Sequence, residues 1–110
     1  MNNLYLKMLV CTALTAFSIG SASAAQWTPS VLVDLVYSYD NGSLFVRFNT
    51  TQVDPDSCGN AFYYAVPFDA PNMEKMFAIL LTSKSTGTPV KAYLSGCSGA
   101  WPVITRLQLL

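Results

Sequence analysis

Cys58 and Cys97 are the residues of this sequence best suited to covalent chemistry, because they remain as an even pair once the N-terminal segment is set aside. In an oxidising compartment such a pair is expected to form a disulfide. The sequence contains no histidine, so the two thiols lack the further ligands of a typical zinc site. We therefore predict a Cys58–Cys97 disulfide and neither a metal nor a cofactor.

Other chemistry finds little support. Without histidine, a serine or cysteine nucleophile lacks its usual general base. Asp34 lies in an apolar segment, where burial would raise its pKa, but strand alternation favours an outward orientation. Residues 54–60 resemble the start of a calcium loop, yet its twelfth position, where a glutamate ligand belongs, is Ala65. We expect no catalytic residue, no metal site and no enzyme; a small hydrolase is the weakest of the alternatives.

Residues 1–24 have the pattern of a signal peptide. Lys7 precedes an apolar run over residues 8–19, and small residues follow at 21–25. The run is shorter than the roughly 20 residues of a membrane-spanning helix, and no later segment supplies one. We expect cleavage after Ala24 or Ala25, a single domain over residues 25–110, no membrane span, and a secreted or periplasmic location.

The charge of the remaining chain excludes one class of partner. Residues 25–110 contain five basic and six acidic side chains, a net charge of −1. That balance gives no electrostatic reason to expect nucleic acid as a partner. A chain of this length forms a modest core, so a disulfide would add useful stability.

Residues 31–39 and 44–48 are rich in β-branched and aromatic side chains, and Asn41-Gly42 lies between them, which predicts a hairpin. Residues 61–68 predict a third strand. Residues 89–94 and 103–109 predict two more, joined by a tight loop over residues 95–100.

One segment has a helical period instead. Its apolar residues recur at helical spacing and predict one amphipathic face; they are Met73, Met76, Phe77, Leu80 and Leu81. Asp69 or Asn72 is expected to cap the start of the helix, and Gly87 to end it.

The predicted order is therefore three strands, one helix and two strands. This order is typical of the OB-fold, a small and partly open Greek-key barrel. We predict a mainly β fold with one helix, a five-stranded OB-like barrel stapled by one disulfide. An α+β roll, or an open sheet covered by a helix, is the alternative.

The aromatic residues provide the best candidates for binding, although core packing is expected to take more than half of them; they are Trp27, Tyr37, Tyr39, Tyr63, Tyr64, Tyr93 and Trp101. Trp27 lies near the expected mature start, and Trp101 follows a glycine-rich loop. Together with the loop hydroxyls they define the candidate binding surface, which comprises Trp27, Ser95, Ser98 and Trp101.

Residues 74–81, followed by Thr86-Gly87-Thr88-Pro89-Val90-Lys91-Ala92-Tyr93, resemble the helix, turn and strand of the B subunits of the subtilase cytotoxin family, which are AB5 toxins. Trp101-Pro102, the Asp40-Asn41 turn and a tryptophan near the mature start are also similar. The convincing part covers about 30 residues.

The resemblance implies an OB-fold, a pentameric ring with helices lining its centre, a catalytic A-type partner chain and binding of sialylated cell-surface glycans. It does not carry over any contact residue, because Leu94 occupies the place of the family's glycan-contacting tyrosine. The leading hypothesis is an exported, non-enzymatic domain that recognises a cell-surface glycan as a homo-oligomer. The alternative is a periplasmic protein-interaction module, such as an inhibitor or an accessory subunit.

Overall fold

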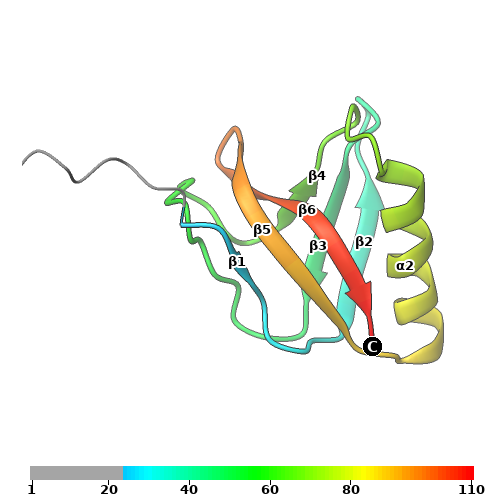
Figure 1. Cartoon of the computed structure of the whole chain (residues 1–110). Helices are drawn as coiled ribbons and strands as arrows, with labels where there is room; N and C mark the ends of the chain where they lie inside the picture. The colour runs from blue at the N-terminus through cyan, green and yellow to red at the C-terminus, as the bar shows by residue number, and fades with distance from the viewer. Residues whose placement is uncertain (1–23) are drawn as a thin grey trace, which may run out of the picture.

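The computed structural model describes residues 24–110, which form one six-stranded mixed sheet and one helix (Figure 1). In chain order the elements are β1 (Gln26–Trp27), β2 (Val33–Ser38), β3 (Leu44–Phe48), β4 (Tyr64–Val66), α2 (Met73–Thr86), β5 (Val90–Ser98) and β6 (Trp101–Leu109). The predicted class, mainly β with one helix, is confirmed. The predicted signal peptide lies outside the described residues, except for Ala24. No helix within residues 24–110 is long and apolar enough to cross a membrane.

The strands lie in the order β1-β5-β6-β4-β3-β2. Neighbouring strands are antiparallel except β4 and β6, which pair in parallel at Ala65 and Val103. Before β2, Val31 and Val90 form an isolated bridge of two backbone hydrogen bonds, with nitrogen-to-oxygen distances of 2.9 and 2.8 Å. The sheet differs from the predicted five-stranded barrel in two ways. It contains the extra strand β1, and it is open, because a single bridge replaces a continuous ladder between β5 and the start of β2.

Four predicted strands have other bounds in the structure: β2 covers Val33–Ser38 instead of residues 31–39, β6 begins at Trp101 instead of residue 103, and β4 and β5 differ as follows. Strand β5 continues through Ser98, so the loop predicted over residues 95–100 shrinks to the turn before Trp101. Register shifts on both sides of Leu94 let the glycine-rich segment remain paired with β6. Strand β4 is shorter than predicted: Tyr64–Val66 pairs with β3, and only Ala65 also pairs with β6.

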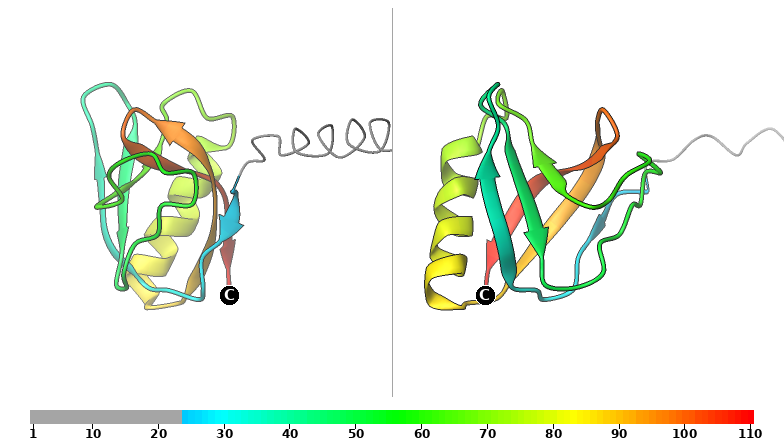
Figure 2. Two further views of the ribbon diagram at one scale, coloured as in Figure 1. Left: turned by 90° about the vertical axis from the view of Figure 1, so that its left-hand side faces the viewer. Right: turned by 180° about the vertical axis from the view of Figure 1, so that it is seen from behind.

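Helix α2 stands beside β2 and also contacts β6 (Figure 2). It ends as predicted at Gly87, whose φ of 70° is in the left-handed region that favours glycine. The predicted cap at Asn72 is wrong: Asn72 occupies the N-cap position, but its side chain donates a hydrogen bond to the Thr105 carbonyl at 3.2 Å. Lys84 donates to the carbonyl of Asp34 at 2.7 Å, and Asp34 is exposed, as predicted.

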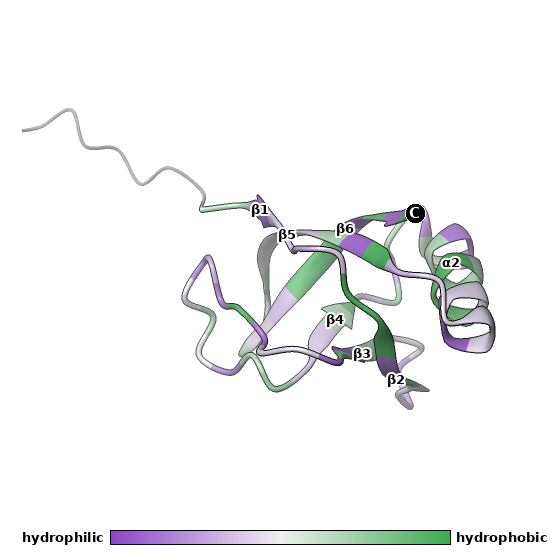
Figure 3. Ribbon diagram, turned by 90° about the horizontal axis from the view of Figure 1, so that it is seen from below, coloured by the Kyte–Doolittle hydropathy of each residue, from purple (hydrophilic) through white to green (hydrophobic). Residues whose placement is uncertain are grey.

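The core lies between α2 and one face of the sheet. Hydrophilic and hydrophobic residues alternate over the C-terminal part of β6 (Figure 3), and Pro102 and Ile104 in its first part are buried. The helix buries only half of its predicted apolar face, since Phe77 and Leu81 remain exposed. The largest fully buried side chains are Tyr64, Phe48, Met76, Leu80, Leu94, Ile104, Val46, Val66, Val90, Pro102 and Ser83.

Tyr64 makes the core sensitive to alkaline pH. Burial raises its pKa; a hydrogen bond from the Val53 N–H at 2.6 Å opposes this rise, and the nearby Asp54 carboxylate adds to it. The unfolded chain ionises this phenol near pH 10, but the folded chain holds the proton to higher pH. Stability from Tyr64 is therefore complete below about pH 10 and is lost as the pH rises through the raised pKa.

We expect Tyr64→Phe to flatten the alkaline loss of stability. It should also lower the free energy of unfolding at neutral pH by about 1 kcal/mol, because the part-buried Val53 N–H loses its acceptor. Urea unfolding at pH values from about 8 to 11 measures both effects. An equally steep alkaline loss in the variant would contradict this role of Tyr64.

Candidate functional site

The face of the sheet that points away from the core carries a row of side chains across four strands. On β3, Leu44, Val46 and Phe48 are buried, so Phe45 and Arg47 lie on the opposite face. Phe45 pairs with Tyr37 on β2 and with Ala65 on β4. Because Ala65 in turn pairs with Val103 on β6, this outer row joins β2, β3, β4 and β6.

Six aromatic side chains gather around this row. We call them the aromatic cluster; they are Tyr37, Tyr39, Phe45, Phe62, Tyr63 and Trp101. Phe45 is central, with centroid distances of 5.3 Å to Tyr37, 5.5 Å to Tyr39 and 5.6 Å to Trp101. Tyr63 links Trp101 at 5.8 Å to Phe62 at 4.6 Å. Most pairs meet edge to face, a favourable geometry for aromatic rings.

The aromatic cluster is only partly shielded from solvent. Tyr39 is 54% exposed and Phe62 is 49% exposed, although each packs against another ring of the cluster. Ala65 is 2% exposed although it belongs to the outer row. The rings therefore cover the sheet at Ala65 and leave part of their surface exposed to solvent.

Two polar features accompany the rings. The Arg47 guanidinium carbon lies 4.2 Å from the centroid of Phe62, a cation–π contact. Partial desolvation raises the pKa of Tyr37, and the neighbouring phenols of Tyr63 and Tyr39 raise it further. Phenols are protonated at neutral pH in any case, so the Tyr37 hydroxyl can both donate and accept hydrogen bonds there.

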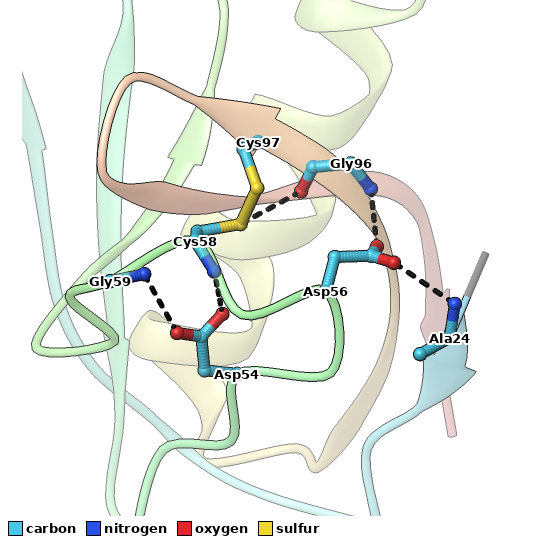
Figure 4. Close-up of a disulfide and its surroundings, with 7 residues drawn as sticks. All are labelled: Ala24, Asp54, Asp56, Cys58, Gly59, Gly96 and Cys97. Carbon is cyan, nitrogen blue, oxygen red and sulfur yellow. Dashed lines mark hydrogen bonds between the residues drawn. A yellow bond between two sulfur atoms is a disulfide. The ribbon is translucent and has the colours of Figure 1, made fainter. Parts of the chain in front are cut away.

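The predicted disulfide between Cys58 and Cys97 is confirmed, with a Cα–Cα distance of 5.5 Å. It joins the connection between β3 and β4 to the far end of β5 (Figure 4). The Asn60 N–H adds a hydrogen bond of 2.8 Å to the carbonyl of Ala100. These links hold the segment before Tyr63 against the hairpin that carries Trp101.

Two aspartates organise the disulfide loop. Asp54 accepts hydrogen bonds from the N–H groups of Cys58 at 2.7 Å and Gly59 at 3.0 Å (Figure 4). Asp56 accepts one from the N–H of Gly96 at 2.7 Å, across to β5. The calcium-like pattern of this segment thus reflects the closing of a loop. Within residues 24–110, no three potential metal ligands come together.

The four predicted site residues have different neighbours in the structure. Trp101 belongs to the aromatic cluster, and Ser98 pairs with it across the hairpin. Trp27 instead packs against Tyr93 at a centroid distance of 5.2 Å, through the pairing of β1 with β5. Ser95 is half-buried on β5.

The prediction missed Phe45 and Phe62. Phe45 could have been found from the alternation of β3, which sets it apart from the three buried residues of that strand. Phe62 lies outside the strands and gives no comparable periodic signal.

No family model matches the chain, and neither do the curated proteins or the solved structures with which it was compared. The resemblance to AB5 toxin B subunits therefore stays a prediction. The aromatic cluster is the observation from which a function can be inferred.

Proposed function

We propose that the protein is an exported, non-enzymatic binding domain that recognises a glycan with its aromatic cluster. The observation that carries the proposal is the gathering of six rings on one outer face, with Tyr39 and Phe62 half exposed. Aromatic faces offer flat apolar surfaces on which sugar rings can stack, and phenol hydroxyls can bond to sugar hydroxyls. Arg47 adds a donor beside Phe62.

We further propose an OB-like architecture. The strand order β2-β3-β4-β6-β5, the parallel pairing of β4 with β6, and the Val31–Val90 bridge support it. OB-folds bind oligosaccharides on the face of their second and third strands and with two flanking loops. Here those strands would be β3 and β4, and the loops would be those next to Tyr39 and Trp101.

A secreted or periplasmic location is part of the proposal. The disulfide supports it, because disulfides persist in oxidising compartments. The signal-peptide pattern of residues 1–24 supports it independently.

We expect Trp101→Ala and Phe62→Ala each to weaken glycan binding by about 10- to 100-fold, since aromatic anchors dominate such contacts. Phe77→Ala is the matched control, because Phe77 is similarly exposed, at 43%, but lies on α2. Binding is first found on a glycan array and then measured by titration calorimetry, with thermal melting to confirm folding. Equal binding by the folded Phe62→Ala and Phe77→Ala variants would contradict the proposal.

The second candidate is a protein-interaction module. The observation that favours it is the apolar surface of α2, where Phe77 and Leu81, the latter 53% exposed, border a hollow of about 260 Å³ with Val36 and Lys84. Exposed apolar patches of this kind mark contacts with other chains. The partner would be a second copy, as in a homo-oligomer or pentamer, or an A-type or envelope protein.

The solution mass measured by light scattering tests whether the protein forms a homo-oligomer. We expect a mass of several chains for the oxidised protein, and a single-chain mass for Phe77→Ser/Leu81→Ser, because the double substitution makes the α2 surface polar. Phe62→Ser is the control and should keep the larger mass. A single-chain mass for the unsubstituted protein would contradict the homo-oligomer.

A further inference from the structure

A groove of about 670 Å³ lies between β6 and the segment that connects β4 with α2. This volume is within the range of small-molecule sites. Its lining combines apolar side chains with a carboxylate, an amide, a hydroxyl and a guanidinium; the residues used below are Pro67, Asp69, Asn72, Val103, Thr105 and Arg106. Such a mixture suits a ligand with both apolar faces and hydroxyl groups.

The groove continues the surface of the aromatic cluster. Trp101 and Val103 alternate along β6, which directs them to one face, and Val103 lines the groove together with Thr105, at which the pairing with β5 shifts register. Val103 belongs both to the outer row that contains Phe45 and to the lining of the groove. Thr105 lies four residues beyond Trp101, about 13 Å along an extended strand, which is roughly the span of three linked sugar rings.

The polar groups of the groove are held in place. The Asn72 amide donates to the Thr105 carbonyl at 3.2 Å and so joins the two walls. The guanidinium carbon of Arg106 lies 4.9 Å from the ring centroid of Tyr93. Groups that are already positioned lose less entropy when a ligand binds.

The charges of the groove favour an uncharged ligand. One acidic residue, Asp69, and one basic residue, Arg106, line the groove, and the Arg106 guanidinium lies over Tyr93 on β5. A carboxylate accepts hydrogen bonds from hydroxyl groups, and a guanidinium donates to hydroxyl oxygens. Together they match the hydroxyl groups of neutral sugars.

We propose that the groove is a second subsite for the ligand of the aromatic cluster. The inference rests on the proposed glycan-binding function and makes it more specific. The ligand is a neutral, linear oligosaccharide of roughly three rings, with one end stacked on the aromatic cluster and the other end hydrogen-bonded beside Asp69 and Arg106.

Titration calorimetry with mono-, di-, tri- and tetrasaccharides of N-acetylglucosamine and of lactosamine-based series tests the groove. We expect the affinity to rise by about tenfold or more up to the trisaccharide and then to level off, because a fourth sugar ring would extend beyond both subsites and make no further contact. Asp69→Ala should remove this gain for the longer members. Glu74→Ala, which removes the same charge on the first turn of α2, should retain it.

The outcomes separate the two proposals. Two results would overturn the second subsite and leave the aromatic cluster as the only proposed site. One is equal affinity for oligosaccharides of all lengths. The other is an undiminished increase of affinity with length in both a folded Asp69→Ala and a folded Arg106→Gln variant. Failure of every member of both series to bind would overturn both proposals. The second subsite would be supported if Asp69→Ala loses the increase of affinity with oligosaccharide length while Glu74→Ala retains it.

Discussion

Removal of the Cys58–Cys97 disulfide should lower the free energy of unfolding by about 4 kcal/mol. The cysteines are 39 positions apart, so the cross-link closes a long loop and restricts the unfolded chain strongly. The folded chain also loses a local constraint, because the disulfide holds the segment before Tyr63 near the hairpin of Trp101. A total stability of about 5 to 15 kcal/mol is usual for a domain, so this loss is a large fraction of it.

Urea unfolding of Cys58→Ser/Cys97→Ser and of the reduced protein measures the effect. The two samples should agree with each other, since both lack the cross-link, and the fluorescence of Trp101 should shift as the hairpin loosens. An unchanged free energy of unfolding in both samples would show that the disulfide does not stabilise the fold.

Leu80→Ala should lower the free energy of unfolding by about 3 kcal/mol. Leu80 is fully buried on α2, so its truncation removes apolar contacts and leaves a cavity in the core. Leu81→Ala is a matched control with the same chemical change at the adjacent position. Leu81 is 53% exposed, and we expect its truncation to cost no more than about 0.5 kcal/mol.

Urea unfolding of both leucine variants compares the two positions directly. Similar losses in Leu80→Ala and Leu81→Ala would contradict the orientation of α2 against the sheet. A large loss in the Leu81 variant alone, with a concentration-dependent melting temperature, would instead indicate that α2 is buried between chains.

The elements with strong local signals could be predicted from the sequence. The hairpin around Asn41-Gly42 and the helix that ends at Gly87 depend on turn chemistry and on regular spacing, which nearby residues determine. Strand β1 could not be predicted, because two residues have no period of their own and pair only with a distant partner. The end of β5 has the composition of a loop, yet pairing with β6 satisfies its backbone.

The candidate site was predictable only in part. Trp101 could be selected as a ring next to a disulfide loop. Its partners Phe45 and Tyr63 come from other segments, and their meeting depends on strand register across β3, β4 and β6. Trp27 has the same residue type and a similar setting, but its pairing with β5 places it against Tyr93.

The pairing of β1 with β5 also determines how the chain must fold. Gln26 and Leu94 are far apart along the chain, so the edge of the sheet at β1 cannot form before β5 is available. The disulfide likewise cannot form before both Cys58 and Cys97 are available. Contacts between such distant segments slow the search for the native state, and folding times of milliseconds to seconds are typical of these topologies. During that interval the unpaired strands are open to aggregation, so the yield of protein should depend on how fast the chain completes its sheet.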